Sequence, residues 1–173
     1  MAQEKMIASR AIDANPERVF ALLADPSRHA AIDGTGWVRE PLDGRPLTAR
    51  GQVFRIAMYH ANHPDGFYEV ANRVEEFDPP RAISWQPGQE DRSGAIGYGG
   101  WFWRYDLVPE GAGTAVTLTY DWSAVPASGR AVVDFPPFGR EHLENSLAHL
   151  DELAIAASPS ASGTGSRGDA GSS

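Results

Sequence analysis

Cysteine is absent from the 173-residue chain, which excludes disulfide bonds and thiolate metal sites. No run reaches the roughly 18 apolar residues that a membrane-spanning helix requires. The first residues, 1–13, contain no continuous apolar stretch of the kind that marks a secretory signal. These absences predict a cytoplasmic protein without a membrane span.

Positive charge is scarce. The chain has 15 Lys and Arg against 23 Asp and Glu, which gives a net charge of −8. The arginines are scattered along the sequence and form no basic stripe. Nucleic acids and anionic membranes repel such a chain, so we predict no nucleic-acid partner.

The composition changes near the end of the chain. Residues 158–173 are rich in Ser and Gly and contain almost nothing to bury, which predicts a disordered tail. The remaining residues, 1–157, have the length of one domain, and we expect a single folded unit there.

The first helix is clearly marked in the sequence. Asn15 is a favourable N-cap, Pro16 suits the first helical position, and Glu17 lies in the first turn. The Asp-Pro pair at 25–26 ends this helix, and a second short helix is predicted over 27–33.

A long helix is predicted near the C-terminus, over 135–157. Leu143, Leu147, Leu150 and Ala154 recur there at helical spacing and form one apolar stripe. This stripe needs a partner surface, and the sheet described next is the available one.

Strands are predicted where apolar and polar residues alternate. They are residues 5–13, 36–42, 51–60, 67–78 and 79–88 and the two strands of a hairpin within 97–122. The short turns between them make the strands antiparallel. The predicted fold class is therefore α+β: a curved antiparallel sheet of about six to seven strands around one long C-terminal helix, with two short helices after the first strand.

One face of the hairpin carries an unusual number of aromatic rings. Trp101, Trp103 and Tyr105 share a face on its first strand, and Tyr120 and Trp122 share a face on its second. Buried Trp and Tyr side chains need hydrogen-bond partners, so Leu or Val would fill an ordinary core at lower cost. Two interpretations stay open, namely a packed aromatic core and the wall of a ligand cavity.

Three local patterns, in their order, resemble a known superfamily. Residues 12–28 combine a strand, an Asn-Pro helix start and an Asp-Pro exit, residues 74–85 contain a double-proline corner before a tryptophan, and residues 103–122 form a hairpin with a Gly-Thr turn. Together with the final helix they resemble the START/Bet v 1-like (SRPBCC, helix-grip) superfamily, most of all its bacterial polyketide cyclase/dehydrase-like branch. The resemblance implies a deep apolar cavity between the sheet and the long helix.

Residues on the predicted inward faces would line that cavity. They are Trp37, Phe54, Met58, Tyr68, Trp85, Trp101, Trp103, Tyr120, Trp122, Phe138 and Asn145.

Four polar residues are candidates for chemistry. His142 is the first choice for a general acid or base, because the ordinary pKa of histidine lies near neutrality. His60 shares a strand face with apolar residues and is the second choice, while Tyr105 and Asn72 could polarise a carbonyl group. Each has a plainer interpretation: a solvated helix face for His142, the sheet rim for His60, and structural hydrogen bonds for Tyr105 and Asn72.

No metal or other cofactor is predicted. His60, His63 and Asp65 lie close together in sequence, but their placement at a strand end and turn favours a solvated turn over a metal site. The Gly-rich stretches do not precede a helix and lack the Gly-Lys-Ser/Thr pattern of a phosphate-binding loop.

Three functions fit these features. Binding of a hydrophobic small molecule, aromatic, lipid-like or polyketide, requires only the cavity, and we favour it. A polyketide cyclase, aromatase or dehydratase that uses His142 or His60 in the same cavity is the alternative, and whether the protein catalyses a reaction stays open. A protein-interaction module, as in the superfamily branch that resembles activators of the Hsp90 chaperone, is the third. We expect a monomer or a homodimer.

Overall fold

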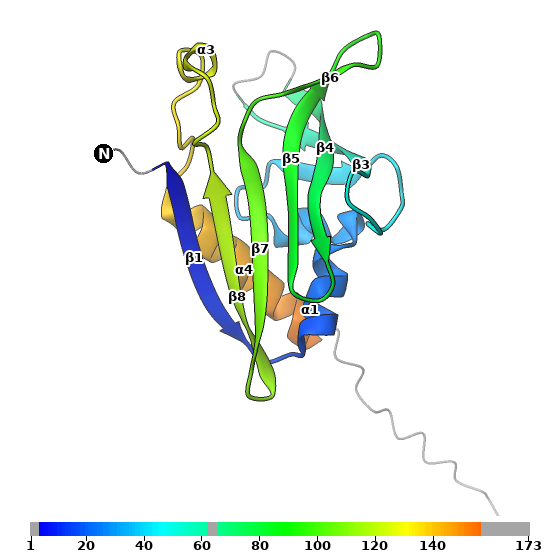
Figure 1. The fold of residues 1–173 in the computed structure, drawn as a ribbon, viewed down its shortest axis with the longest axis vertical. Coiled ribbons are helices and arrows are strands. Elements are labelled where there is room, and N and C mark those ends of the chain that lie inside the picture. The colour runs from blue at the N-terminus through cyan, green and yellow to red at the C-terminus, as the bar shows by residue number, and fades with distance from the viewer. Residues whose placement is uncertain (1–3, 62–65, 157–173) are drawn as a thin grey trace, which may run out of the picture.

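The sequence folds around one antiparallel sheet, shown in the computed structural model of Figure 1. The structure describes residues 4–61 and 66–156. The predicted tail at 158–173 lies outside these residues, as do His63 and Asp65. The sheet follows the order β1-β8-β7-β5-β4-β3-β2, and the short strand β6 pairs with β5.

The strands occupy nearly the predicted positions. They are β1 (Lys5–Ile12), β2 (Val38–Pro41), β3 (Val53–Tyr59), β4 (Phe67–Asp78), β5 (Ala82–Glu90), β6 (Ile96–Tyr98), β7 (Phe102–Glu110) and β8 (Gly113–Asp121). The antiparallel α+β fold with a long C-terminal helix is thus confirmed.

The helix near the N-terminus begins where its sequence signals predict, whereas the long helix near the C-terminus begins later than predicted. They are α1 (Pro16–Leu23), the 3-10 helix η1 (Pro26–Arg28), α2 (His29–Ile32), α3 (Ala127–Arg130) and α4 (Arg140–Ala156). In α1 the Asn15 side chain accepts a hydrogen bond from the Arg18 backbone N–H at 2.9 Å, as the N-cap pattern predicts.

The predicted start of the long helix at residue 135 is wrong, because α4 begins at Arg140. Pro137 restricts the residue before it to extended conformations, which prevents the helix from including Pro136. The first turn forms instead after Gly139, whose carbonyl accepts from the His142 backbone N–H at 3.1 Å.

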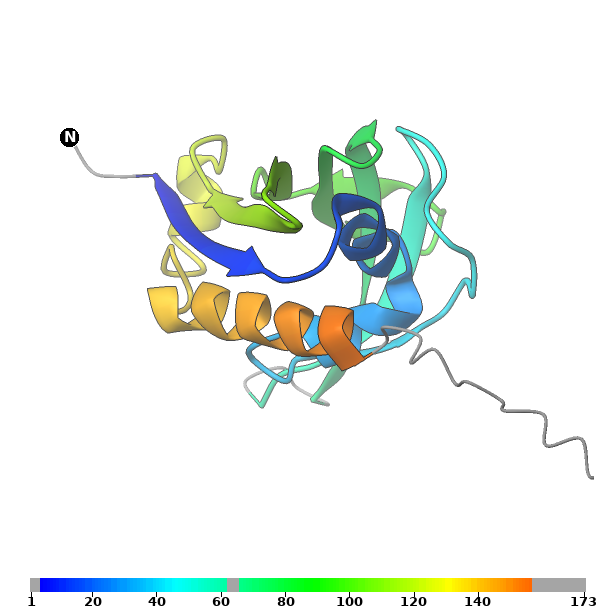
Figure 2. The same ribbon diagram turned by 90° about the horizontal axis from the view of Figure 1, so that it is seen from below.

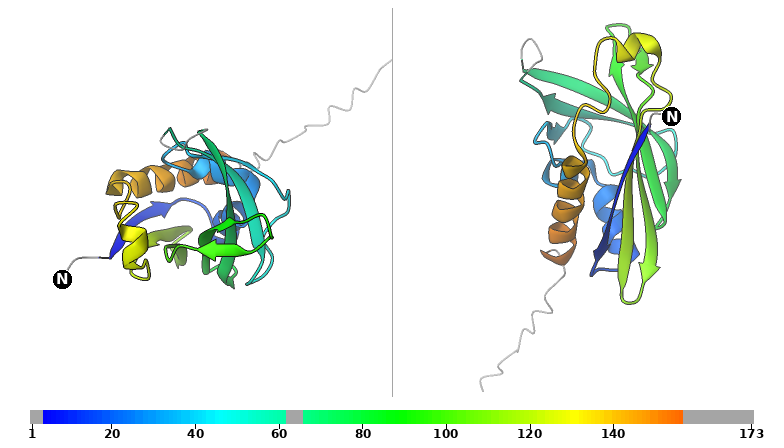
Figure 3. Two further views of the ribbon diagram at one scale, coloured as in Figure 1. Left: turned by 90° about the horizontal axis from the view of Figure 1, so that it is seen from above. Right: turned by 90° about the vertical axis from the view of Figure 1, so that its left-hand side faces the viewer.

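Helix α4 lies against one face of the sheet, as Figures 1 and 2 show. The segment between α3 and α4 runs from one end of the sheet down to the start of α4 (Figure 3). Along the last turns of α4, Leu147, Leu150 and Ala154 are fully buried and belong to one core with α1 and the centre of β7 and β8. We call this the packed end of the domain.

The register of the sheet brings the aromatic residues of three strands together. Trp85 of β5 pairs with Trp103 of β7, and Trp103 pairs with Tyr120 of β8. Directly opposed residues share a face in an antiparallel sheet, so the three rings lie side by side on the inner face. These three rings lie at the other end of the sheet from the packed end, and we call this part of the domain the cavity end.

Candidate functional site

A cavity of about 290 Å³ lies between the inner face of the sheet and the first two turns of α4. Strands β3, β4, β5, β7 and β8 supply one wall, α2 and the loop after it supply another, and residues 133–138 supply a third. Small-molecule sites commonly occupy roughly 300–1,000 Å³, so this volume suits a compact ligand.

Nine aromatic rings lie on the wall of this cavity. They belong to Trp37, Tyr68, Trp85, Trp101, Trp103, Tyr105, Tyr120, Phe135 and Phe138. The rings also pack on one another: the centroid of Trp103 lies 4.6 Å from that of Tyr120 and 5.6 Å from that of the stacked Phe138. The aromatic face therefore serves as packing and as cavity wall at once.

Most of the residues predicted for the site lie on this wall. They are Trp37, Met58, Tyr68, Asn72, Trp85, Trp101, Trp103, Tyr105, Tyr120, Phe138 and His142. They come from β3, β4, β5, β7, β8 and the start of α4, and from the chain just before β2, β7 and α4.

Four predicted residues lie elsewhere. His60 contacts the edge of Trp37 at 4.6 Å between ring centroids, outside the cavity wall. Phe54 is buried behind the wall against Trp85, and Trp122 is buried beside Tyr120. Asn145 is exposed on α4. Successive helical residues lie about 100° apart, which places Asn145 roughly 160° around the helix from the buried Leu147.

Asp33, which the sequence interpretation overlooked, is the acidic group on the cavity wall. It directly follows α2, and its carboxylate accepts hydrogen bonds from the Thr35 backbone N–H at 3.2 Å, the Thr35 hydroxyl at 2.9 Å and the Val38 backbone N–H at 3.0 Å. Only 8% of its side chain is exposed. These donors hold the carboxylate in one orientation, as in an Asx-turn.

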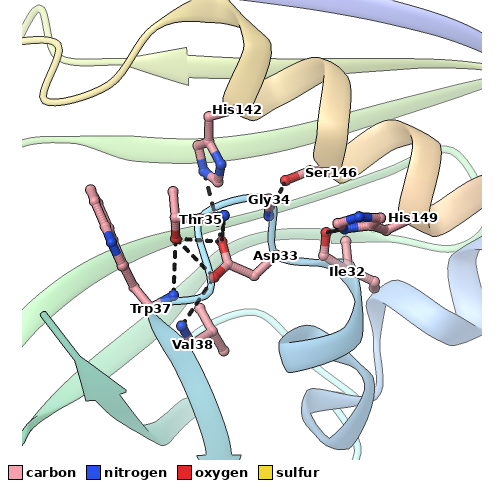
Figure 4. Close-up of polar contacts among 9 residues, drawn as sticks. All are labelled: Ile32, Asp33, Gly34, Thr35, Trp37, Val38, His142, Ser146 and His149. Carbon is pink, nitrogen blue, oxygen red and sulfur yellow. Dashed lines mark hydrogen bonds and ion pairs between the residues drawn. The ribbon is translucent and has the colours of Figure 1, made fainter.

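His142 faces Asp33 from the first turn of α4 (Figure 4). Its Nε2 lies 3.9 Å from Asp33 Oδ1, which is too long for a direct hydrogen bond. The ring is enclosed by Phe138 at 4.5 Å and Trp103 at 5.6 Å between centroids. Burial lowers the pKa of His142 below its ordinary value, against the opposing attraction of Asp33 and Glu141.

Gly34 brings the Asp33 loop into contact with α4. Its backbone N–H donates to the Ser146 hydroxyl at 3.1 Å. A Cβ atom at this position would lie 2.5 Å from the His142 carbonyl oxygen and 2.8 Å from His142 Nδ1. The absence of a side chain at Gly34 thus allows the loop to approach the helix closely enough to place Asp33 opposite His142.

His29 is a second buried histidine of the cavity wall that the sequence interpretation did not single out. Its Nε2 lies 2.8 Å from the Leu23 carbonyl oxygen, and its ring stacks on Trp85 at 5.0 Å. A carbonyl only accepts, so Nε2 carries the proton of this bond. Burial lowers the pKa of His29, and the hydrogen bond to Leu23 and the charge of Asp25 offset this only in part.

The tyrosine hydroxyls on the wall stay protonated at neutral pH. Burial raises the pKa of Tyr105 and of Tyr120, and the negative charge of Asp33 adds to the effect on Tyr105. The Asn72 side-chain amide lies 3.4 Å from the Phe54 carbonyl oxygen, a long hydrogen bond across β3 and β4. Tyr105 and Tyr120 can therefore act as donors, while Asn72 is partly engaged in the sheet.

Other kinds of site have no support in the described residues. No group of three or more His, Cys, Asp or Glu side chains in 4–61 and 66–156 is arranged to hold a metal ion. Within the same ranges, no helix has the length and hydrophobicity of a membrane span.

The family of the protein follows from comparison with known proteins. A model of the family described as polyketide cyclase / dehydrase and lipid transport matches residues 3–154. The chain belongs to this family. The resemblance seen in the sequence is confirmed.

This polyketide cyclase / dehydrase and lipid transport family member is similar to one curated protein in sequence and to two solved structures in fold. The uncharacterized protein Rv0088 of Mycobacterium tuberculosis is 27% identical over 165 residues, which cover 85% of this chain and 68% of Rv0088. NE0264 from Nitrosomonas europaea has a TM-score of 0.66 at 15% identity, covering 90% of this chain and 97% of that one. Ms6760 from Mycobacterium smegmatis has a TM-score of 0.63 at 18% identity, with 88% and 92% covered.

Proposed function

We propose that the protein binds a hydrophobic, aromatic small molecule in the cavity between the sheet and α4. One observation carries the proposal: nine aromatic side chains line a cavity of about 290 Å³. Flat rings offer large apolar contact area, and the few polar groups among them can orient a ligand. The family's description, which names lipid transport and polyketide cyclases, supports a hydrophobic ligand.

Native mass spectrometry of the gently purified protein tests this proposal. We expect an additional mass that is released when the protein is denatured. Trp103→Ala should reduce the occupancy strongly, because Trp103 contributes to the wall. Val108→Ala is the matched control, since Val108 is exposed on the same strand. A bare mass, together with no binding of added aromatic probes, would contradict the proposal.

A second candidate function is acid–base catalysis of the cyclase or dehydratase type. The observation that favours it is His142 facing Asp33 on the cavity wall. A neutral His142 would take a proton from a carbon next to a carbonyl group, while the protonated Tyr105 would donate a hydrogen bond to that carbonyl. The surrounding rings would hold a flexible chain in reacting geometry.

A comparison of the ligands bound to the wild type and to a His142→Gln variant distinguishes the two functions. A carrier should retain the same molecule in the variant and in the wild type. A catalyst should retain its substrate in the variant and its product in the wild type, with a mass difference of one water for a dehydration. Mass spectrometry of the released ligand reads the difference directly.

A further inference from the structure

The charged side chains on the cavity wall are of one sign, negative, among the described residues. No Lys or Arg of the described residues lines the cavity, whereas the carboxylate of Asp33 does. A carboxylic acid ligand would therefore place a second negative charge in a largely apolar space with no cation to balance it. Burial of an uncompensated charge is costly, and a like charge nearby increases the cost.

Asp33 retains capacity for one more hydrogen bond. A carboxylate has about four lone-pair positions. The Thr35 backbone N–H donates to Oδ1 and the Val38 backbone N–H donates to Oδ2. The single proton of the Thr35 hydroxyl is shared between Oδ1 at 3.0 Å and Oδ2 at 2.9 Å, so three protons serve the four positions. Oδ1 is the oxygen nearest to His142. A ligand that donates a hydrogen bond to Oδ1 would satisfy the remaining position.

His142 offers the complementary group. Burial keeps its ring neutral near pH 7, so only one ring nitrogen carries a proton. The Asp33 carboxylate lies near Nε2 and favours the proton on that nitrogen. The pair thus presents an acceptor at Asp33 and a donor at His142, separated by 3.9 Å, a span that one oxygen atom can bridge.

We infer that the cavity selects neutral aromatic ligands with a hydroxyl group, which bridges Asp33 and His142, and rejects carboxylic acids. A hydroxyl both donates and accepts, as this bridge requires. A carboxylate and an ether only accept, and an ammonium only donates. This inference rests on the proposed binding function and narrows its ligand to phenol-like or alcohol-bearing aromatic molecules.

Three naphthalene probes test the inference by isothermal titration calorimetry near neutral pH. They are 2-naphthol, 2-methoxynaphthalene, which lacks the donor, and 2-naphthoate, which is ionised. We expect 2-naphthol to bind about tenfold more tightly than 2-methoxynaphthalene, because its hydroxyl donates to a charged group. We expect 2-naphthoate to bind roughly a hundredfold more weakly than 2-naphthol.

An Asp33→Asn variant removes the charge and keeps the turn, because Asn also favours Asx-turns. The gap between 2-naphthol and 2-naphthoate should shrink to within about tenfold in this variant. Asp91→Asn is the matched control. Asp91 is exposed, and it also accepts backbone N–H hydrogen bonds in a turn, from Ser93 at 2.8 Å and Ala95 at 3.1 Å. This control should leave all three affinities unchanged.

The outcomes distinguish this inference from the function on which it rests. Equal binding of the three probes to the wild type, or tightest binding of 2-naphthoate, would overturn the charge selection while leaving the binding function intact. The same holds if Asp33→Asn and Asp91→Asn behave alike. Failure of the wild type to bind any of the probes would overturn both proposals. The comparison on the wild type decides the inference even if Asp33→Asn does not fold.

Discussion

The two ends of α4 are built from different kinds of side chain. At the packed end, Leu147, Leu150 and Ala154 share one core with aliphatic residues of α1, β1 and β8, and they are almost fully buried. At the cavity end, His142 of α4 and Phe138 just before the helix contact the ring of Trp103 and line the cavity. Side chains in a core interdigitate at the density of organic crystals, and the packed end follows this rule. The cavity end departs from it, because its rings border a space of about 290 Å³.

This contrast shows how one sheet-and-helix sandwich can provide stability and a site together. The packed end supplies close-packed apolar surface, so the cavity end can retain space and buried polar groups. Substitutions at the two ends should therefore separate stability from ligand binding, and the predictions below test that separation.

The largest loss of stability is expected from a substitution at the packed end. Leu150→Ala should lower the free energy of unfolding by about 2–5 kcal/mol, because it leaves a space in a core that cannot collapse fully. Urea denaturation measures this change, and the affinity for 2-naphthol should stay the same. A Leu150→Ala variant with weakened binding and unchanged stability would reverse the assignment of the two ends.

The next effect is expected where the Asp33 loop meets α4. Gly34→Ala places a methyl group 2.5 Å from the His142 carbonyl oxygen, so the loop or the helix must shift. We expect a stability loss of about 1–3 kcal/mol, as is typical of overpacking. Ligand affinity should also fall, because Asp33 moves relative to His142. Gly97→Ala is the control, since a Cβ there meets nothing within 4 Å, and it should leave both quantities nearly unchanged.

Acidification should destabilise the domain through its cavity end. Burial lowers the pKa of His29 and of His142 below the ordinary value of 6.5, so the unfolded chain binds protons before the folded chain does. Stability is therefore fully present above about pH 6.5 and falls as the pH decreases toward the folded-state pKa values. The slope is at most about 1.4 kcal/mol per pH unit for each histidine.

A His29→Gln variant isolates one of these two contributions. Gln can still donate to the Leu23 carbonyl but does not titrate. Urea midpoints compared between about pH 7.5 and about pH 5.5 should show a shallower pH dependence in this variant. An identical dependence in the variant and the wild type would show that His29 is not among the titrating groups.

The smallest effect is expected on the outer face of the sheet. Arg104 bridges Glu76 and Asp106 there, on partly exposed positions of β4 and β7. Arg104→Gln should change stability by no more than about 1 kcal/mol, and high salt should remove the difference, because exposed ion pairs are screened. Ligand affinity should not change, and a loss of affinity would connect the outer face to the cavity.

Features encoded over short stretches of sequence were predictable. The N-cap at Asn15 and the alternation in β7 and β8 depend on neighbours within a few residues, and both predictions agree with the structure. The seven predicted wall residues that lie on strands were predictable for the same reason, because the face of a strand follows from alternation once the sheet is known. They are Met58, Tyr68, Asn72, Trp85, Trp103, Tyr105 and Tyr120.

Features that depend on distant contacts were not predictable. Asp33, in the sequence Asp-Gly-Thr, has the pattern of an ordinary turn, and nothing local shows that α4 will place His142 opposite it. The positions of the four predicted residues that lie outside the wall also depend on such contacts. Asn145, for example, was chosen three residues after His142, whereas the helix turns Ser146 toward the Asp33 loop.

The pairing of β1 with β8 also has a consequence for the order in which the chain acquires structure. Lys5 pairs with Asp121, so β1, at the edge of the sheet, meets its neighbour β8 only after more than a hundred further residues have been made. At cellular translation rates this delay is on the order of ten seconds. The nascent chain therefore carries β1 without this strand partner until β8 has been made, and the cavity is assembled only after β8 and α4 emerge.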